Sequence, residues 1–175
     1  MKKLIFASAA AIIMSAAASY AQDSESLTYN LSGSIASNCE IVPEGVVNVN
    51  VDMLNFGNQG LAAVAYSCNS PYELTIQSAN GGMEHQESGG AIVILYDVET
   101  FGFFNTTGNG PQSFNSAAIA APASAVVATE DSWANILVNG GLQLGNIDLI
   151  FPGLANFNVA GTYEDQLTLT LTATL

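Results

Sequence analysis

Basic residues are almost absent from this chain of 175 residues, which has 2 Lys and Arg against 15 Asp and Glu. Both are lysines, Lys2 and Lys3, at the extreme N-terminus. Nucleic-acid binding depends on cationic groups that displace counterions from phosphates, and attraction to an anionic membrane surface depends on a cluster of such groups. An Arg or Lys clamp on a substrate phosphate or carboxylate is excluded in the same way. We therefore expect no nucleic-acid partner.

Long apolar runs are also missing beyond the N-terminus. Lys2 and Lys3 precede one apolar run, Leu4 to Ala18, and small residues stand at Ser19 and Ala21. This order of charged, apolar and small residues predicts a secretory signal peptide at residues 1–21. No later run reaches the roughly 18 residues that span a bilayer. We expect export through the periplasm without membrane insertion.

Cysteine is scarce, with Cys39 and Cys68 as the pair. In an oxidising compartment, one disulfide between them is the default interpretation. Two free thiols or two metal ligands are the alternatives. A bridge would stabilise the domain by roughly 3–4 kcal/mol if it acts by restricting the unfolded chain.

Helical periodicity is rare, whereas alternation of apolar and polar residues is common. The clearest case is Leu167–Leu175, where Leu or Ala alternates with Thr, as in a half-buried strand. Gly161–Asp165 before it is expected to be a turn. Pro122 interrupts the Ala-rich stretch 113–128, which favours a loop or short strand over a helix. Further strands are expected at residues 46–51, 62–68, 72–77, 91–98 (buried on both faces) and 142–151. Short strands at this spacing predict a single all-β domain, a β-sandwich.

A second amphipathic pattern lies directly after the predicted cleavage site. Its apolar face comprises Leu27, Tyr29, Leu31, Gly33 and Ile35, with polar residues between them. One interpretation is an ordinary first strand of the domain's own sheet, since terminal strands are often held in that way.

The order of several short motifs suggests another interpretation. The alternating segment ends in Ser-Asn-Cys39 and is followed by Leu54-Asn-Phe-Gly57. Val64-Ala-Tyr-Ser-Cys68 leads to Tyr72-Glu-Leu-Thr-Ile76, and the last motif is Ala160-Gly-Thr-Tyr-Glu-Asp-Gln-Leu-Thr-Leu-Thr-Leu171. In this order the motifs resemble chaperone–usher pilus subunits of the archaic class, which share the spore-coat-protein-U-like domain. The resemblance covers both ends of the mature chain and thins between about residues 83 and 158.

This resemblance implies an incomplete immunoglobulin-like sandwich (the pilin fold) at residues 36–175, preceded by a donor-strand extension at residues 22–35. Leu167, Leu169 and Leu171 would line one wall of the acceptor groove left by the missing strand. Leu27, Tyr29 and Leu31, with Gly33 at a shallow position, would insert into the groove of a neighbouring subunit by β-strand addition.

The resemblance also implies partners and a location. A periplasmic chaperone would cover the groove with one of its own strands, and an outer-membrane usher would assemble the subunits. The product would be a structural subunit of an extracellular fimbria at the cell surface, supporting adhesion or biofilm formation. The alternative is a self-sufficient secreted β-sandwich that binds glycan or calcium, with residues 27–35 paired in its own sheet.

Candidate metal sites are few. His85 lies between Glu84 and Glu87 in sequence, but one histidine gives no ligand-rich set, which favours a solvated loop residue. Glu130-Asp131 with Asn135 could bind Ca²⁺ through oxygen atoms, although no calcium-loop spacing is present.

Catalytic sites are equally hard to assemble. Carboxylate pairs serve glycosidases, but no Arg or Lys remains to position a substrate, and no nucleophile elbow occurs. We expect no enzyme activity and no cofactor. Trp133 is expected in the core. Phe101, Phe103 and Phe104 form an aromatic cluster that is expected in the core, with an exposed adhesive loop as the alternative.

Overall fold

The fold is described from a computed structural model of the chain. The described residues are 26–55, 57–104, 110–139, 142–153 and 159–174. Contacts divide the chain into two units, residues 1–34 and residues 35–175. Helical structure in the described part of the second unit comprises α1 (Trp133–Asn139), η1 (Gln86–Ser88) and η2 (Ser116–Ile119). Strands make up the other elements, so the expected all-β fold is confirmed.

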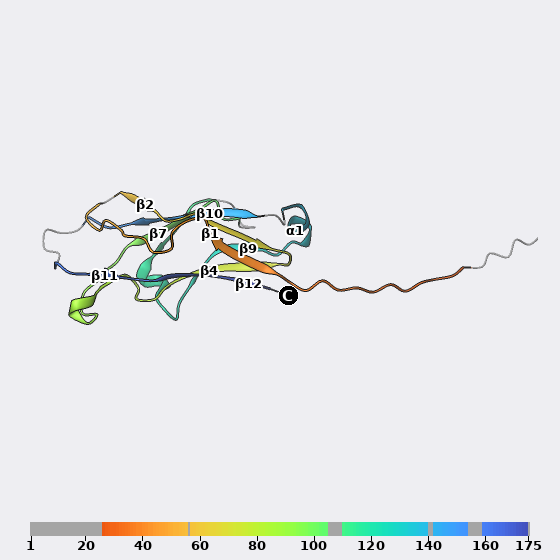
Figure 1. Cartoon of the computed structure of the whole chain (residues 1–175), viewed down its shortest axis with the longest axis horizontal. Coiled ribbons are helices and arrows are strands. Elements are labelled where there is room, and N and C mark those ends of the chain that lie inside the picture. Colours follow the sequence, from red (N-terminus) through yellow and green to blue (C-terminus); the bar gives the residue numbers. More distant parts are fainter. Residues whose placement is uncertain (1–25, 56, 105–109, 140–141, 154–158, 175) are drawn as a thin grey trace, which may run out of the picture. The chain divides into compact units, whose positions relative to one another are not determined.

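One layer of the domain is a six-stranded antiparallel sheet (Figure 1). The strand β10 lies at its centre and pairs with β3 near its start, with β2 near its end and with β7 over five residues. The edges are β1 beside β3 and β8 beside β7. The strands are β1 (Cys39–Pro43), β2 (Asn58–Gly60), β3 (Val64–Cys68), β7 (Asp97–Phe101), β8 (Gln112–Asn115) and β10 (Gln143–Ile150).

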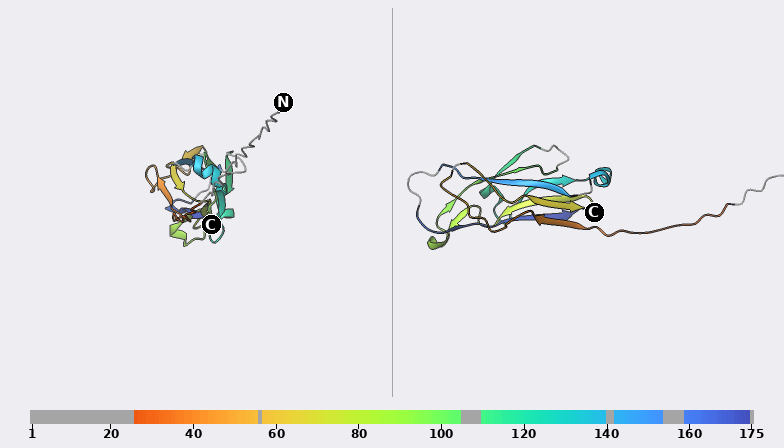
Figure 2. Two further views of the ribbon diagram at one scale, coloured as in Figure 1. Left: turned by 90° about the vertical axis from the view of Figure 1, so that its right-hand side faces the viewer. Right: turned by 45° about the horizontal axis from the view of Figure 1, so that its top comes forward.

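The second layer combines two three-stranded sheets, ordered β12-β4-β9 and β11-β5-β6. Because β5 follows β4 and β11 precedes β12, the β5–β11 pair continues the β4–β12 pair after a short break. Figure 2 shows this layer facing the first one. The strands are β4 (Tyr72–Ser78), β5 (Met83–His85), β6 (Val93–Ile94), β9 (Ala125–Glu130), β11 (Tyr163–Glu164) and β12 (Leu167–Ala173).

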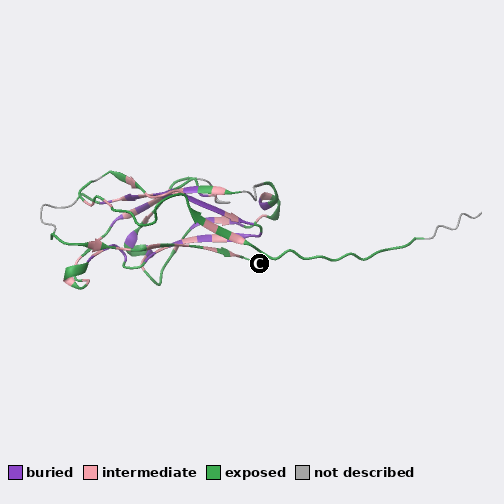
Figure 3. Ribbon diagram, in the orientation of Figure 1, coloured by how far each residue is buried: buried purple, intermediate pink, exposed green. Residues whose placement is uncertain are grey.

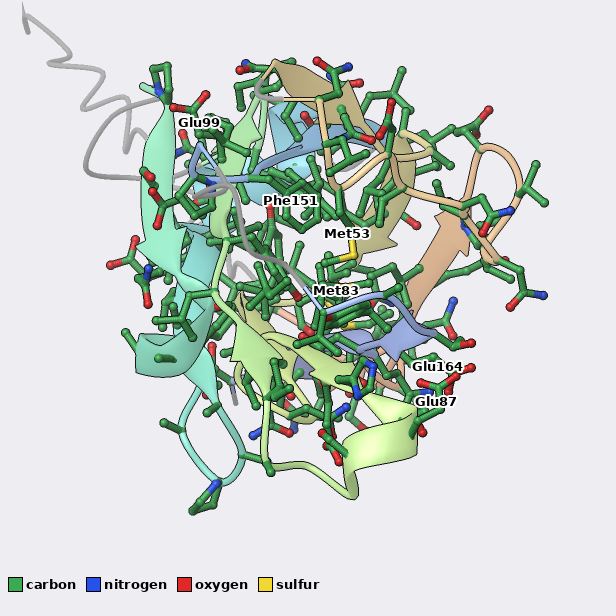
Figure 4. All side chains as sticks on the ribbon, turned by 90° about the vertical axis from the view of Figure 1, so that its left-hand side faces the viewer. Met53, Met83, Glu87, Glu99, Phe151 and Glu164 are labelled. Atoms are coloured by element: carbon green, nitrogen blue, oxygen red, sulfur yellow. A yellow bond between two sulfur atoms is a disulfide. The ribbon has the colours of Figure 1, made fainter. Side chains whose placement is uncertain are left out.

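The core lies between the layers. Alternate residues of β4, such as Leu74 and Ile76, are fully buried and belong to one apolar cluster with Val98 of β7 and Ile147 of β10. In Figure 4 the side chains of Phe151, Met53 and Met83 lie inside, whereas those of Glu99 and Glu164 lie at the periphery. The alternation follows from strand geometry, since successive side chains point to opposite faces of a sheet.

The disulfide prediction is confirmed. Cys39 and Cys68 are bonded to each other and lie opposite one another where β1 pairs with β3. The disulfide therefore ties an edge strand to the interior of its sheet.

Most of the predicted strands are present in the structure. The segments with the clearest apolar–polar alternation were predicted best. Four strands, β3, β4, β10 and β12, confirm the predictions for residues 62–68, 72–77, 142–151 and 167–175 within the described residues. The Ala-rich stretch 113–128 holds parts of β8 and β9 with η2 between them. The turn expected at Gly161–Asp165 contains the short strand β11.

Two strand predictions were wrong. Residues 91–98 do not form one strand buried on both faces: β6 pairs with β5, while β7 pairs with β10 and β8. The chain changes sheets between them, which leaves Val93 and Leu95 exposed. Residues 46–51 form no strand, and Val46 and Val47 are exposed. Alternation alone does not make a strand when no neighbouring strand supplies hydrogen bonds.

Candidate functional site

The last strand, β12, lies at the edge of its sheet. In the described part of the chain it pairs with β4 alone, from Leu167 opposite Ser78 to Ala173 opposite Tyr72. The backbone groups along its other edge therefore have no strand partner among the described residues. Such an edge is a template for pairing with another chain.

The apolar face of β12 is incompletely covered. Leu167, Leu169 and Leu171, the residues predicted to line a groove, share one face of the strand and pack against the core, but all three are only half-buried. On the neighbouring β4, by contrast, Leu74 and Ile76 are fully buried. Both strands alternate equally well, so the difference comes from what lies over them.

A second unpaired edge lies close to β12. The strand β1 pairs with β3 alone among the described strands. Its inner residue Ile41 packs against the core and is also half-buried. Residues of β1 and β12 approach within 8 Å between Cα atoms. Two sheet edges thus border one side of the sandwich, and the apolar residues of both are partly open to solvent.

The sequence prediction included β12 but missed β1. The signal in Cys39-Glu-Ile-Val-Pro43 is weak, because only Cys39 and Ile41 alternate inward before Pro43 ends the strand. The pairing of β1 with β3 and the closeness of β1 to β12 depend on tertiary structure, so they cannot be predicted from the periodicity of the sequence.

The predicted donor residues are exposed. Residues 26–38 form no strand, and Leu27, Tyr29 and Leu31 are 76%, 75% and 92% exposed (Figure 3). A Cβ added at Gly33 would meet no atom within 4 Å. A segment with three large, regularly spaced apolar side chains is therefore presented to solvent.

The start of the second unit is held by one asparagine. Asn69 donates from Nδ2 to Ala36 O at 3.0 Å and accepts from Asn38 N through Oδ1 at 2.6 Å. Its backbone N–H donates to Asn38 O at 3.1 Å. These bonds fix residues 36–38 beside the end of β3 and so define the point from which the N-terminal segment leaves the domain.

The expectation for His85 was wrong. It is not a solvated loop residue: it lies on β5, opposite Tyr163 of β11, and is 4% exposed. Its Nε2 lies 3.2 Å from Ala160 O and 3.4 Å from Glu87 Oε2, while Nδ1 has no hydrogen-bond partner among the described atoms. A Cβ at Gly161 would overlap the imidazole ring, so a glycine there permits the close approach. The short β5–β11 pair buries a histidine that the sequence placed in a loop.

Glu87 closes over this histidine from η1. Backbone N–H groups, its own and that of Thr162, hold the pKa of the Glu87 carboxyl below its usual range, and His85 adds to this effect. Thr162 N lies 3.2 and 3.0 Å from the two carboxylate oxygens. Among the described residues, no three His, Cys, Asp or Glu side chains are grouped as a metal centre requires.

Glu130, a candidate calcium ligand, accepts hydrogen bonds at the start of α1. It is buried, and its Oε1 accepts from Ser132 N at 2.8 Å and from Asn135 Nδ2 at 3.3 Å. The hydroxyl of Ser132 accepts from Asn135 N, as a helix N-cap does. The Glu130 carboxylate and the Asn135 amide therefore hold the start of α1.

The aromatic predictions had mixed outcomes. Phe103 is buried and stacks on Tyr66 with ring centroids 5.7 Å apart, whereas Phe101 is exposed. Trp133 was expected in the core and is 61% exposed, so that prediction was wrong. The reason is local, because α1 turns Ile136 inward and leaves Trp133 outside.

A polar hollow lies beside the β5–β11 pair. It is lined by Asn80, Glu84, Gln86, Glu164, Asp165 and Gln166. Apart from Ala79, the lining side chains are acidic or amide-bearing, and Asp165 already accepts four hydrogen bonds within the domain. The hollow offers no combination of nucleophile and base.

Comparison with known proteins identifies no family for this chain. The chain matches no protein-family model, and no curated protein is significantly similar to it. No helix in the described ranges is long and apolar enough to cross a membrane. Within the described residues, the candidate site of the second unit is the pair of unpaired edges, β1 and β12. In the first unit, the candidate is the exposed apolar segment that holds Leu27, Tyr29 and Leu31.

Proposed function

We propose that this protein is a structural subunit of a surface pilus, an immunoglobulin-like domain that is one strand short and is completed by the N-terminal segment of another copy. The carrying observation is the pair of unpaired edges, β1 and β12, with half-buried apolar residues along both. In this proposal the space beside β12 is the acceptor groove, and residues 22–35 are the donor strand.

The spacing of donor and acceptor residues supports this pairing. Leu27, Tyr29, Leu31 and Gly33 recur every second residue, as do Leu167, Leu169, Leu171 and Ala173 on β12. An extended strand rises by about 3.3 Å per residue, so both rows have the same length. A donor strand beside β12 would bring each large apolar side chain over the incompletely covered face.

Burial of the donor side chains would contribute a large share of the energy of association. Burying one large apolar side chain contributes roughly 1.5–3 kcal/mol, and Leu27, Tyr29 and Leu31 are all largely exposed in the single chain. Three of them give about 5–9 kcal/mol as an upper estimate. Main-chain hydrogen bonds to the free edge of β12 add to this, as in other cases of β-strand addition.

An open edge with apolar side chains also explains why a chaperone would be needed. Unpaired strands and apolar patches promote aggregation before assembly. A periplasmic chaperone that lends a strand would cover β12 until an outer-membrane usher exchanges it for the donor segment of the next subunit. The chain beyond Lys3 has no Lys or Arg with which to bind nucleic acid.

The rival, a self-sufficient secreted sandwich, requires residues 27–35 to pair in the domain's own sheet. Residues 26–38 carry no strand in the structure, and Leu31 is almost fully exposed. That arrangement favours the pilus subunit over the rival.

The test is assembly of the purified mature protein without partners. We expect multimers that resist SDS but dissociate on heating, because strand exchange buries a whole β-strand between two domains. Deleting residues 22–34 should abolish them while leaving the disulfide and the β-sheet circular dichroism intact. A stable monomer whose properties are unchanged by the deletion would overturn the proposal.

A further inference from the structure

We infer that the exposed apolar face of α1 is a second contact between adjoining copies, packed against the domain that receives this copy's donor strand. The inference rests on the proposed function and adds to it a surface outside the groove. The face is defined by Trp133 and Leu137, four residues apart on one side of the helix.

The first argument is the length of the connection between the two domains. Residues 36–38 are bonded to Asn69, and Gly33 is the last predicted donor position before them. Three residue steps separate Gly33 from Ala36, and an extended chain spans at most about 3.3–3.6 Å per residue. The copy whose groove receives Gly33 must therefore come within about 10–11 Å of Ala36 in the donating copy.

The second argument is the position of α1 at this same end of the domain. Tyr72, three residues after Asn69, lies opposite Glu130 where β4 pairs with β9. Glu130 accepts hydrogen bonds from Ser132 and Asn135 at the start of α1. Figures 1 and 2 show α1, the start of β1 and the C-terminus at one end of the domain. A neighbouring copy that lies close to Ala36 will therefore also lie close to α1.

The third argument is the chemistry of α1. Trp133 is 61% and Leu137 88% exposed, and Val138 beside Leu137 is exposed as well. Two copies without Lys or Arg beyond Lys3 cannot form Lys or Arg salt bridges with each other. Contact between two acidic copies has to come from apolar packing and neutral hydrogen bonds, and α1 presents its apolar side chains at the junction.

The experiment uses the single tryptophan of the chain, Trp133, as a reporter. Polymers of the mature wild-type protein are compared with a filled monomer, which is the full mature chain carrying Leu31→Asp, mixed with a synthetic peptide of residues 26–35. The Leu31→Asp chain is designed to accept a strand but not to donate one. Fluorescence emission and acrylamide quenching of Trp133 are measured in both, beside SDS-resistance of the complexes.

We expect Trp133 to be shielded in the polymer, with blue-shifted emission and at least twofold less quenching than in the filled monomer. The Leu137→Gln variant should polymerise and remain SDS-resistant while its Trp133 quenches as in the monomer. Leu54→Gln, at a 70% exposed leucine that precedes β2, is the matched control and should leave the shielding unchanged.

Two kinds of result would overturn the inference, and they are distinguishable. If SDS-resistant polymers form but Trp133 is quenched equally in polymer and filled monomer, strand exchange stands and the α1 contact falls. The α1 contact also falls if Leu137→Gln polymers keep Trp133 fully shielded. If no polymer forms and the peptide does not bind the Leu31→Asp chain, both the proposed function and the α1 contact fall.

Discussion

Tyr96 donates a hydrogen bond from its hydroxyl to Asp165 Oδ2 at 2.6 Å, and so joins the β6–β7 segment to the break between β11 and β12. Asp165 also accepts from Ser78 Oγ at 2.7 Å and from Asn80 N at 3.0 Å. Tyr96 and Ser78 are both almost fully buried. One carboxylate therefore holds the place where the second layer changes from the β4–β12 pair to the β5–β11 pair.

We predict that Tyr96→Phe lowers the free energy of unfolding by about 1.5–3 kcal/mol, the usual contribution of a hydrogen bond to a charged acceptor. Asp165→Ala should cost more, because it leaves the buried hydroxyls of Tyr96 and Ser78 without this acceptor. Urea unfolding measures both. Tyr29→Phe, at a tyrosine that is exposed in the single chain, is the control and should change nothing. Equal midpoints for Tyr96→Phe and wild type would contradict the prediction.

Alkaline pH should destabilise the domain through its tyrosines. Burial raises the pKa of Tyr96, and the hydrogen-bonded Asp165 carboxylate raises it further. Burial likewise raises the pKa values of Tyr66 and Tyr72. A group with a higher pKa in the folded state keeps its proton there while the unfolded chain ionises. The stabilisation is therefore complete below about pH 10 and is lost as pH rises toward the folded-state pKa.

The measurement is the urea midpoint as a function of pH, with tyrosinate absorbance recorded in parallel. No lysine follows Lys3, so no lysine titration overlaps in a chain without residues 1–21. The decline above about pH 10 should be shallower in Tyr96→Phe. A midpoint that stays constant while the tyrosines ionise would refute this account.

Leu31→Asp should abolish the SDS-resistant ladder of multimers. The substitution places a charge where the proposal buries a leucine, and an unpaired buried carboxylate is strongly unfavourable. The matched control is Ser32→Asp, which adds the same charge on the opposite face of the predicted donor strand. Normal assembly of Leu31→Asp, or loss of assembly in both variants, would argue against the assigned face.

On the acceptor side, Leu169→Ala should weaken binding of the residue 26–35 peptide to the Leu31→Asp chain by about tenfold, or about 1.4 kcal/mol. Leu169 is a half-buried residue of β12 that faces the core, so its truncation removes apolar contact from the proposed groove. Thr170→Ala changes the exposed face of the same strand and serves as the control. Fluorescence anisotropy of a labelled peptide gives both affinities. Unchanged binding to Leu169→Ala would show that Leu169 does not line the groove that binds the peptide.

Acid pH should loosen the η1 region through Glu87. Its pKa is depressed by backbone hydrogen bonds, its own and that from Thr162, and by His85. A depressed pKa contributes stability that is present above about pH 4.3 and is lost as pH falls through the lower folded-state value. Glu87→Gln should flatten this part of the pH profile, measured by urea unfolding. Glu44→Gln, at an exposed position after β1, is the control and should retain the profile.

Periodicity identified the strands whose two faces differ most. Leu and Thr alternate along residues 167–172, and Tyr72–Ser78 alternates between buried and half-buried positions. These sequences became β12 and β4 because alternation follows directly from strand geometry. The two cysteines of the chain left one possible intramolecular disulfide, and it is present.

Depth of burial was decided by tertiary structure. The sequence placed His85 in a solvated loop and Trp133 in the core, and the structure reverses both assignments. His85 is buried because β11, almost 80 residues later in the chain, pairs with β5. Trp133 is exposed because the short α1 has one covered side, which Ile136 occupies.

Composition and alternation by themselves determined that the chain is all-β, strongly acidic and provided with two amphipathic segments near its ends. The tertiary structure decided which strands have two neighbours and which have one. The alternation of apolar and polar side chains along a strand is a property of its own residues. Its hydrogen-bond partners and the side chains that bury its apolar face come from other segments. For that reason residues 46–51 alternate without forming a strand, and β12 alternates as well as β4 but remains at an edge with its leucines half-covered.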